Sequence, residues 1–226
     1  MKHIISVTIL IFSLLSCKAQ SPIINLGNTD DGITQMDVPE NGYYKDVNNV
    51  LNDFEGTWLY TNGNKSLKIT LVKNTLYFNG KFYEDIIIGG YQYIENGVEK
   101  INTLSDANIP NIGRDASIKG NNIYDDCSII PADDCVEGEK RLDLSIKDTI
   151  TTKHFGDLVL HKRTANGQEA LKAMIDIGYT GENYKDVPTP LPTMPNQMRN
   201  IILIKPFYLL LLIYGDVAIH CGSLKP

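Results

Sequence analysis

Four Asn-Gly pairs spread along the chain limit its fold more than any other feature of the sequence. They are Asn62-Gly63, Asn79-Gly80, Asn96-Gly97 and Asn166-Gly167. Asn-Gly favours the positive φ angles of a two-residue type I′ turn, and each pair here stands between runs typical of β-strands. The pattern therefore predicts a series of antiparallel hairpins.

The runs around these turns predict about eight strands. In the run 141–147 the apolar side chains alternate, which places one face of the strand on a core and the other in water. In the run 66–78 the alternation changes phase after Leu71, and Gly89-Gly90 interrupts the next run, so we expect a β-bulge and a kink. The expected strands are Thr57–Tyr60, Ser66–Phe78, Lys81–Glu95, Val98–Leu104, Ser117–Lys119, Arg141–Lys147, Asp157–Arg163 and Ala170–Ile177.

One short helix is expected before the first strand. Apolar residues recur at helical spacing from Val47 to Phe54, Asp46 is placed to cap the N-terminus, and Gly56 follows the end. The predicted fold class is therefore all-β. It is an antiparallel curled sheet, a sandwich or a small lipocalin-like barrel of about eight strands, preceded by this helix.

The first twenty residues predict export. A short basic start is followed by an apolar run from Ile4 to Leu15, which is too short to remain as a membrane-spanning helix. The sequence Leu-Leu-Ser before Cys17 resembles a bacterial lipobox, so residues 1–16 are interpreted as a signal peptide and Cys17 as the lipid-attachment residue. Cleavage before Gln20 by an ordinary signal peptidase is the alternative. We expect a lipid-anchored protein of the cell envelope or, in the alternative, a soluble periplasmic or secreted one.

The remainder of the chain divides by composition. Residues 17–42 are polar and typical of a flexible tether, residues 43–180 hold the predicted strands, and residues 181–200 form a Pro-rich connector. Residues 201–226 are an apolar tail. For this tail four interpretations stay open: a closing strand at Ile201–Lys205, a buried or pairing segment, a second anchor, or a non-native extension of the reading frame.

The charge excludes one class of partner and restricts another. The chain has 21 Lys and Arg against 27 Asp and Glu. A nucleic-acid binder needs a basic surface to neutralise phosphates, so nucleic acid is not an expected partner. Removing residues 1–16 takes away only Lys2 and makes the net charge more negative. We therefore expect any attachment to an anionic membrane to come from the lipid.

The most distinctive polar cluster is an acidic segment with two cysteines. Cys127 and Cys135 close a short loop, and in an oxidising envelope a disulfide between them is expected. The alternative for this segment is calcium, for which carboxylates supply hard oxygen ligands, although the spacing of a calcium-binding helix–loop–helix is missing. The candidate ligands are Asp125, Asp126, Asp133 and Asp134. Otherwise this segment is a solvated acidic loop, and no other cofactor is expected.

No catalytic residue is predicted. The chain has no Gly-x-Ser-x-Gly turn, no His-Glu-x-x-His helix and no phosphate-binding glycine loop. His154 and His161 are expected as polar surface residues. Glu84 and Asp85 are neighbours on one expected strand, so their side chains point to opposite faces and do not converge on one substrate.

Two resemblances add to this interpretation. The block Phe54-Glu55-Gly56-Thr57-Trp58 resembles the start of a lipocalin-type barrel, which implies that Trp58 closes one end and stacks near an arginine, here Arg163. The alternative is that Trp58 simply anchors a core. The chain also resembles a domain-of-unknown-function family of small exported bacterial proteins, many of them predicted lipoproteins. That resemblance implies export, but no activity. The stretches that carry it are Cys17–Gln20, Gly42–Asp46, Phe54–Tyr60, Gly90–Gly97 and Asn166–Ala170.

Two functions follow as hypotheses. The first is a non-catalytic, anchored β domain that binds a small apolar or amphipathic ligand in the mouth of its barrel. The second is a structural or interaction module of the cell envelope with a filled core. A cavity lined by Leu, Ile and Tyr would favour the first, whereas tight internal packing would favour the second. The ligand and the oligomeric state are left open.

Overall fold

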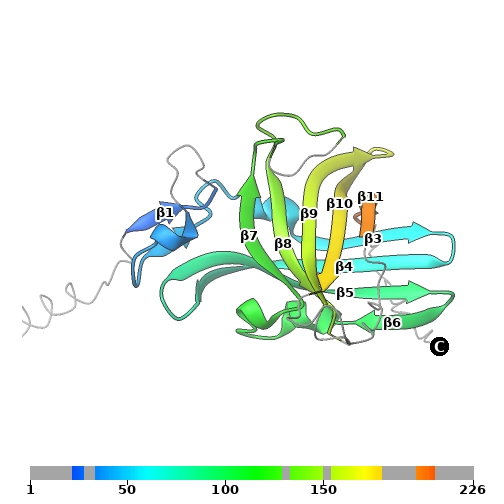
Figure 1. The fold of residues 1–226 in the computed structure, drawn as a ribbon, viewed down its shortest axis with the longest axis horizontal. Helices are drawn as coiled ribbons and strands as arrows, with labels where there is room; N and C mark the ends of the chain where they lie inside the picture. Colours follow the sequence, from blue (N-terminus) through cyan, green and yellow to red (C-terminus); the bar gives the residue numbers. More distant parts are fainter. Residues whose placement is uncertain (1–21, 28–33, 129–132, 150–153, 180–196, 207–226) are drawn as a thin grey trace, which may run out of the picture.

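Eight antiparallel strands close into a barrel in the computed structural model, which describes residues 22–27, 34–128, 133–149, 154–179 and 197–206 (Figure 1). Around the barrel the strand order is β5-β4-β3-β11-β10-β9-β8-β7, and β7 pairs again with β5. The strands are β3 (Gly56–Asn62), β4 (Lys65–Phe78), β5 (Tyr83–Glu95), β7 (Ile118–Tyr124), β8 (Arg141–Lys147), β9 (His154–Ala165), β10 (Gln168–Tyr179) and β11 (Gln197–Ile204).

Two pairings close the barrel. β11 lies antiparallel to β3 with Ile204 opposite Leu59, and Ile87–Gly89 of β5 lies opposite Ile118–Gly120 of β7. The prediction of an all-β, lipocalin-like barrel of about eight strands is confirmed, and the open sheet and the sandwich are excluded. For the apolar tail, the structure shows the closing strand, which is the end of β11 and reaches Ile204.

All four Asn-Gly pairs lie at hairpin turns. In the turns after β5 and β9 both residues have positive φ angles, 55° and 73° for Asn96 and Gly97 and 52° and 75° for Asn166 and Gly167. These are the backbone angles of a type I′ turn. One further strand outside the barrel order, β6 (Val98–Asn102), pairs antiparallel with the C-terminal end of β5.

The inside of the barrel is filled by its own side chains. Alternate residues of each strand point inward, and the inner ones of β4, β8, β9 and β10 are 0–1% exposed. A cavity that holds a water molecule would leave exposed area on its walls. Among the described residues, the barrel therefore has a packed core. These inner residues include Leu67, Ile69, Leu71, Leu142, Leu144, Ile146, Leu158, Leu160, Leu171, Ala173 and Ile175.

The change of phase in β4 has its cause in a second apolar cluster. Val72 packs on the outer face against Ile86, Ile88 and Ala116. The register shift comes later than the change of phase, between Asn74 and Tyr77. Strand β5 is thus buried on both faces where it leaves the barrel wall.

The expected helix is a single turn of 3-10 helix, η2 (Val50–Phe54). Asp46 caps it, because its carboxylate accepts hydrogen bonds from the backbone N–H groups of Val50 and Leu51. Val47 is 50% exposed and takes no part in the apolar face, so this part of the helix prediction is wrong.

Trp58 is buried next to η2. Its Nε1 donates to the carbonyl of Phe54 at 3.0 Å, and the side chain is 1% exposed. The expected stacking of Arg163 on Trp58 is wrong, since the Nζ of Lys205 lies 5.2 Å from the centre of the ring instead. Arg163 lies on the outer face of β9, in alternation with the inward-facing Leu158 and Leu160.

The N-terminal segment folds back onto the barrel. Strand β1 (Ile23–Asn25) pairs in parallel with β2 (Tyr43–Lys45), which pairs in parallel with the start of β5. Leu26 and Val38 are at most 2% exposed. The described parts of 17–42 therefore belong to the fold, and the interpretation of that range as a tether is wrong for them.

The described residues also form three further 3-10 helices. They are η1 (Gln35–Asp37), η3 (Leu104–Asn108) and η4 (Gly113–Asp115). No helix among the described residues has the length and apolar character needed to cross a membrane.

Candidate functional site

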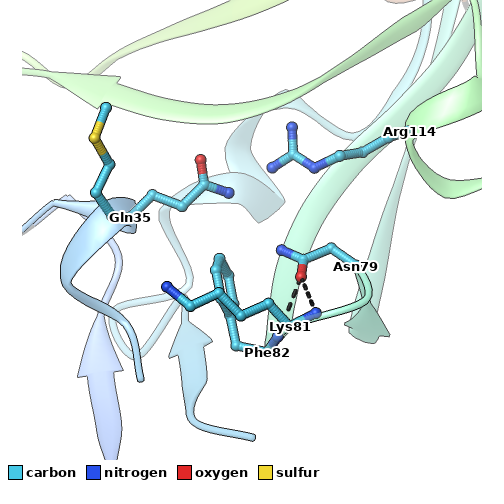
Figure 2. Close-up of a pocket in the computed structure, with 6 residues that line it drawn as sticks. Gln35, Asn79, Lys81, Phe82 and Arg114 are labelled. Carbon is cyan, nitrogen blue, oxygen red and sulfur yellow. Dashed lines mark hydrogen bonds between the residues drawn. The ribbon is translucent and has the colours of Figure 1, made fainter. Parts of the chain in front are cut away.

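A pocket of about 350 Å³ lies outside the barrel, between the N-terminal segment and the β4–β5 hairpin. Figure 2 shows the Gln35 amide and the Arg114 guanidinium converging from opposite sides, above Asn79 and Phe82. The pocket is lined by Gln35 and Met36 of η1, Asn79, Lys81 and Phe82 of the hairpin loop, and Arg114 of η4.

Arg114 is held in place by a buried carboxylate. Glu84 is 0% exposed, and its two oxygens accept hydrogen bonds from Nε and Nη2 of Arg114 at 2.8 and 2.7 Å. The side-chain amides of Gln35, Asn79 and Asn121 also donate to Glu84. Such a two-pronged ion pair fixes the guanidinium more firmly than a single contact does.

Asp85 points to the other face of the strand and holds a different set of groups. It accepts hydrogen bonds from the hydroxyl of Tyr43 at 2.5 Å and from the backbone N–H of Asp46 at 3.0 Å. Burial, together with the neighbouring Asp85, raises the pKa of Tyr43, so the phenol stays protonated and remains a donor. Glu84 and Asp85 therefore do not converge on one substrate, as their positions on the strand predicted.

The pocket presents positive charge and amide groups to solvent. Two of the three nitrogens of Arg114 are bound to Glu84, whereas Nη1 makes no hydrogen bond to any residue that the structure describes. Lys81 is exposed on another wall and lies 5.9 Å above the ring of Phe82. Glu84 balances the charge of Arg114, and Lys81 interacts electrostatically with the carboxylate of Asp37. Both cations still offer N–H donors to an acceptor in the pocket. This combination suits a carboxylate attached to a small apolar group.

Sequence reasoning did not find this pocket. Its residues come from three loops separated by up to eighty positions, and no spacing rule connects Gln35, Lys81 and Arg114. The one local signal was the Asn79-Gly80 turn. There Asn79 Oδ1 accepts hydrogen bonds from the backbone N–H groups of Lys81 and Phe82, both at 3.1 Å, and so shapes the wall of the pocket (Figure 2).

The predicted disulfide between Cys127 and Cys135 is present. Its loop is fastened to the outside of the barrel by ion pairs. Asp134 contacts Arg163 at 3.1 Å and Lys172 at 2.5 Å, and Glu139 also pairs with Arg163. Hydrogen bonds from these two cations lower the pKa of Asp134 to about 2.

The four candidate calcium ligands are dispersed over the disulfide loop. Asp134 faces the barrel, Asp125 pairs with Lys140, Asp126 accepts a hydrogen bond from the backbone N–H of Ser128, and Asp133 is exposed. Within the described ranges, which omit 129–132, no three acidic, His or Cys side chains form a group suited to a metal ion. Calcium binding by this loop stays a prediction.

His161 is buried, so its expected place on the surface is wrong. It is 3% exposed under the disulfide loop, with Nδ1 3.9 Å from Glu139. Burial, with a smaller contribution from Arg163, lowers the pKa of His161 and favours its neutral form. The alternation of β9 predicted an outward side chain but not the loop that covers it. The side chain of His154, Cys17 and the tail after residue 206 lie outside the described residues.

Asp143 lies on the outer face of β8, and we expect its carboxyl group to make the stability of the protein depend on pH. Burial, and to a lesser degree Asp157, raises the pKa of Asp143 to about 6. Its folded-state pKa is above the unfolded one, so this group's contribution to stability is fully present below about pH 4 and is lost as pH rises through 6. Asp143→Asn is therefore expected to raise the free energy of unfolding by about 2 kcal/mol at pH 7.5 and much less at pH 4.5.

Urea unfolding at the two pH values measures this difference. Asp157→Asn removes only the neighbouring charge and is the matched control, with a smaller gain expected at pH 7.5. An equal gain for Asp143→Asn at both pH values would show that the charge on Asp143 is not the cause.

The model of a family of unknown function, DUF6705, matches residues 1–205, and the match ends one residue after β11. No curated protein and no solved structure matches the chain.

Proposed function

We propose that this chain, which belongs to the DUF6705 family of unknown function, is an exported, lipid-anchored binding protein of the bacterial cell envelope. Its ligand is a small carboxylate with an apolar group, held in the pocket beside Arg114. The observation that carries this proposal is the guanidinium of Arg114, which Glu84 holds in place at the wall of the pocket.

Because the barrel is packed, we place the proposed binding site outside it. The hypothesis of a ligand in the barrel mouth needs inner volume, and the inner side chains described are at most 1% exposed along four strands. The outer pocket keeps the amphipathic character that this hypothesis assigned to the ligand. Phe82 and Met36 offer apolar contact, and Lys81 and Arg114 offer charge.

The pocket is tested with N-acetylphenylalanine and its amide as probes. The two compounds differ only in the carboxylate, and the acid is expected to bind at least about tenfold more tightly, which is the effect of one charge-assisted hydrogen bond. Lys81→Gln is expected to weaken binding of the acid, whereas Lys100→Gln, an exposed lysine on β6, leaves it unchanged. Titration calorimetry gives the affinities. Equal binding of acid and amide would overturn the assignment of the ligand class.

The anchor is tested separately. Lipid attachment at Cys17 is supported by the sequence Leu-Leu-Ser-Cys after an apolar run. Cys17→Ala is expected to move the protein from the membrane fraction to the soluble fraction. The unchanged chain is the control and is expected to stay in the membrane fraction. If the variant stays with the membrane, Cys17 is not the anchor.

A structural or interaction module is the second candidate function. The filled barrel favours it, because a module of this kind needs a rigid body rather than a cavity. Failure of every carboxylate probe, with the protein still anchored and folded, would favour this second function.

A further inference from the structure

The end of the molecule that carries β1 exposes apolar side chains. Ile23 is 56% exposed, and Leu76 and Phe78 are each 46% exposed. Ile23 lies beside Tyr43, Tyr43 beside Tyr83, and Tyr83 beside Phe78, so these residues form one row across four strands. Paired residues on neighbouring strands share a face of the sheet. We call the row from Ile23 to Phe78 the tip face.

The tip face is larger than a single exposed side chain. Three strand spacings separate Ile23 from Phe78, a width of about 14 Å. The rings of Phe78 and Tyr83 are in contact, with their centres 5.1 Å apart. Ile23 and Phe78 supply most of its exposed apolar area, because Tyr43 between them is 7% exposed and lies beneath the Nζ of Lys45. Exposed apolar side chains grouped on one face mark contact with another molecule or with a membrane.

The length of the chain indicates which of these covers the tip face. Ile23 follows Cys17 by six positions, so six peptide units join their Cα atoms. Fully extended, they span about 20 Å. A lipid on Cys17 therefore keeps β1, the edge of the tip face, within about 20 Å of the membrane surface.

We infer that the tip face docks on the lipid surface that holds the anchor. This inference rests on the lipid attachment included in the proposed function. The chain has more acidic than basic residues, so the contact is apolar rather than electrostatic. Glu84 alternates with Tyr83 along β5, so Glu84 and Arg114 lie on the opposite face from Phe78. Docking through the tip face thus leaves the pocket open to the aqueous side.

Tryptophan quenching by brominated lipids tests the docking. The natural Trp58 is 1% exposed inside the barrel and gives a constant background. Phe78→Trp puts a tryptophan on the tip face. Val98→Trp is the control, because Val98 is 54% exposed and pairs with Glu95 at the other end of β5 from Tyr83. The strand has 13 residues from Tyr83 to Glu95, a path of about 40 Å. Each full-length lipidated protein is reconstituted in phosphatidylcholine vesicles with bromine on the acyl chains.

The added fluorescence of Phe78→Trp is expected to fall about twofold in brominated vesicles, while that of Val98→Trp stays the same. Unquenched Phe78→Trp in protein that floats with the vesicles overturns the docking, and a cross-linked dimer through the tip face would then identify a second copy as the occupant. Protein that does not float with the vesicles overturns the anchor, and with it the inference. The two failures are thus distinguishable.

Discussion

Replacing Gly90 with alanine is expected to lower the free energy of unfolding by at least about 3 kcal/mol, because the added methyl group meets rigid backbone. A Cβ atom at Gly90 would lie 1.8 Å from the carbonyl oxygen of Thr103 and 2.5 Å from its carbonyl carbon. The two segments cannot simply separate. Thr103 N–H donates to the carbonyl of Tyr91 at 2.8 Å, and the Thr103 hydroxyl accepts from the N–H of Tyr91 at 3.0 Å.

Urea unfolding followed by circular dichroism measures the effect. Gly97→Ala is the matched control in the turn after β5, where a Cβ meets nothing within 4 Å. That position has a φ of +73°, so alanine there costs only about 1 kcal/mol of backbone strain. Losses of equal size at Gly90 and Gly97 would contradict the close approach of the two backbones.

Arg114→Met is expected to cost about 3 kcal/mol, because it leaves the fully buried Glu84 without its cation. The second substitution Glu84→Gln in the same protein is expected to restore most of that loss. A neutral amide at this position needs no counter-charge and keeps much of the volume and hydrogen bonding of glutamate.

Thermal and urea unfolding of the single and double variants form the test. Lys65→Met is the control, since both partners of its ion pair with Glu95 at 3.1 Å are partly exposed, and such surface pairs contribute about 1 kcal/mol or less. If Arg114→Met is no more harmful than Lys65→Met, or if Glu84→Gln fails to rescue it, the buried ion pair does not hold this region together.

The parts of the fold that were predictable are those encoded locally. Asn96-Gly97 and Asn166-Gly167 need only their own backbone preferences to form a turn, and the alternation in 141–147 needs only the period of a strand. The observed β8 has the bounds that this alternation predicted. Together these local signals predicted about eight antiparallel strands and left a curled sheet, a sandwich and a lipocalin-like barrel open; the pairings β3–β11 and β5–β7 select the barrel.

The features that were missed depend on contacts between distant segments. Residues 22–27 contain Asn and Gly like a linker, and only pairing with Tyr43–Lys45 makes them a strand. His161 has the pattern of an outward residue, and only the disulfide loop buries it. The pocket beside Arg114 joins loops that no motif connects. Composition and periodicity describe short windows of sequence, so they do not report such contacts.

The pairing of β11 with β3 also sets an order of events during synthesis. β3 is the first strand of the barrel and β11 the last, so the seam closes only when Ile204 has arrived beside Leu59. A chain synthesised from its N-terminus delivers that residue after all the other strands of the barrel. Contacts so distant in sequence form slowly, and until then both edges of the growing sheet are unpaired. The nascent barrel therefore needs protection from neighbouring chains at the step when its last strand is still missing.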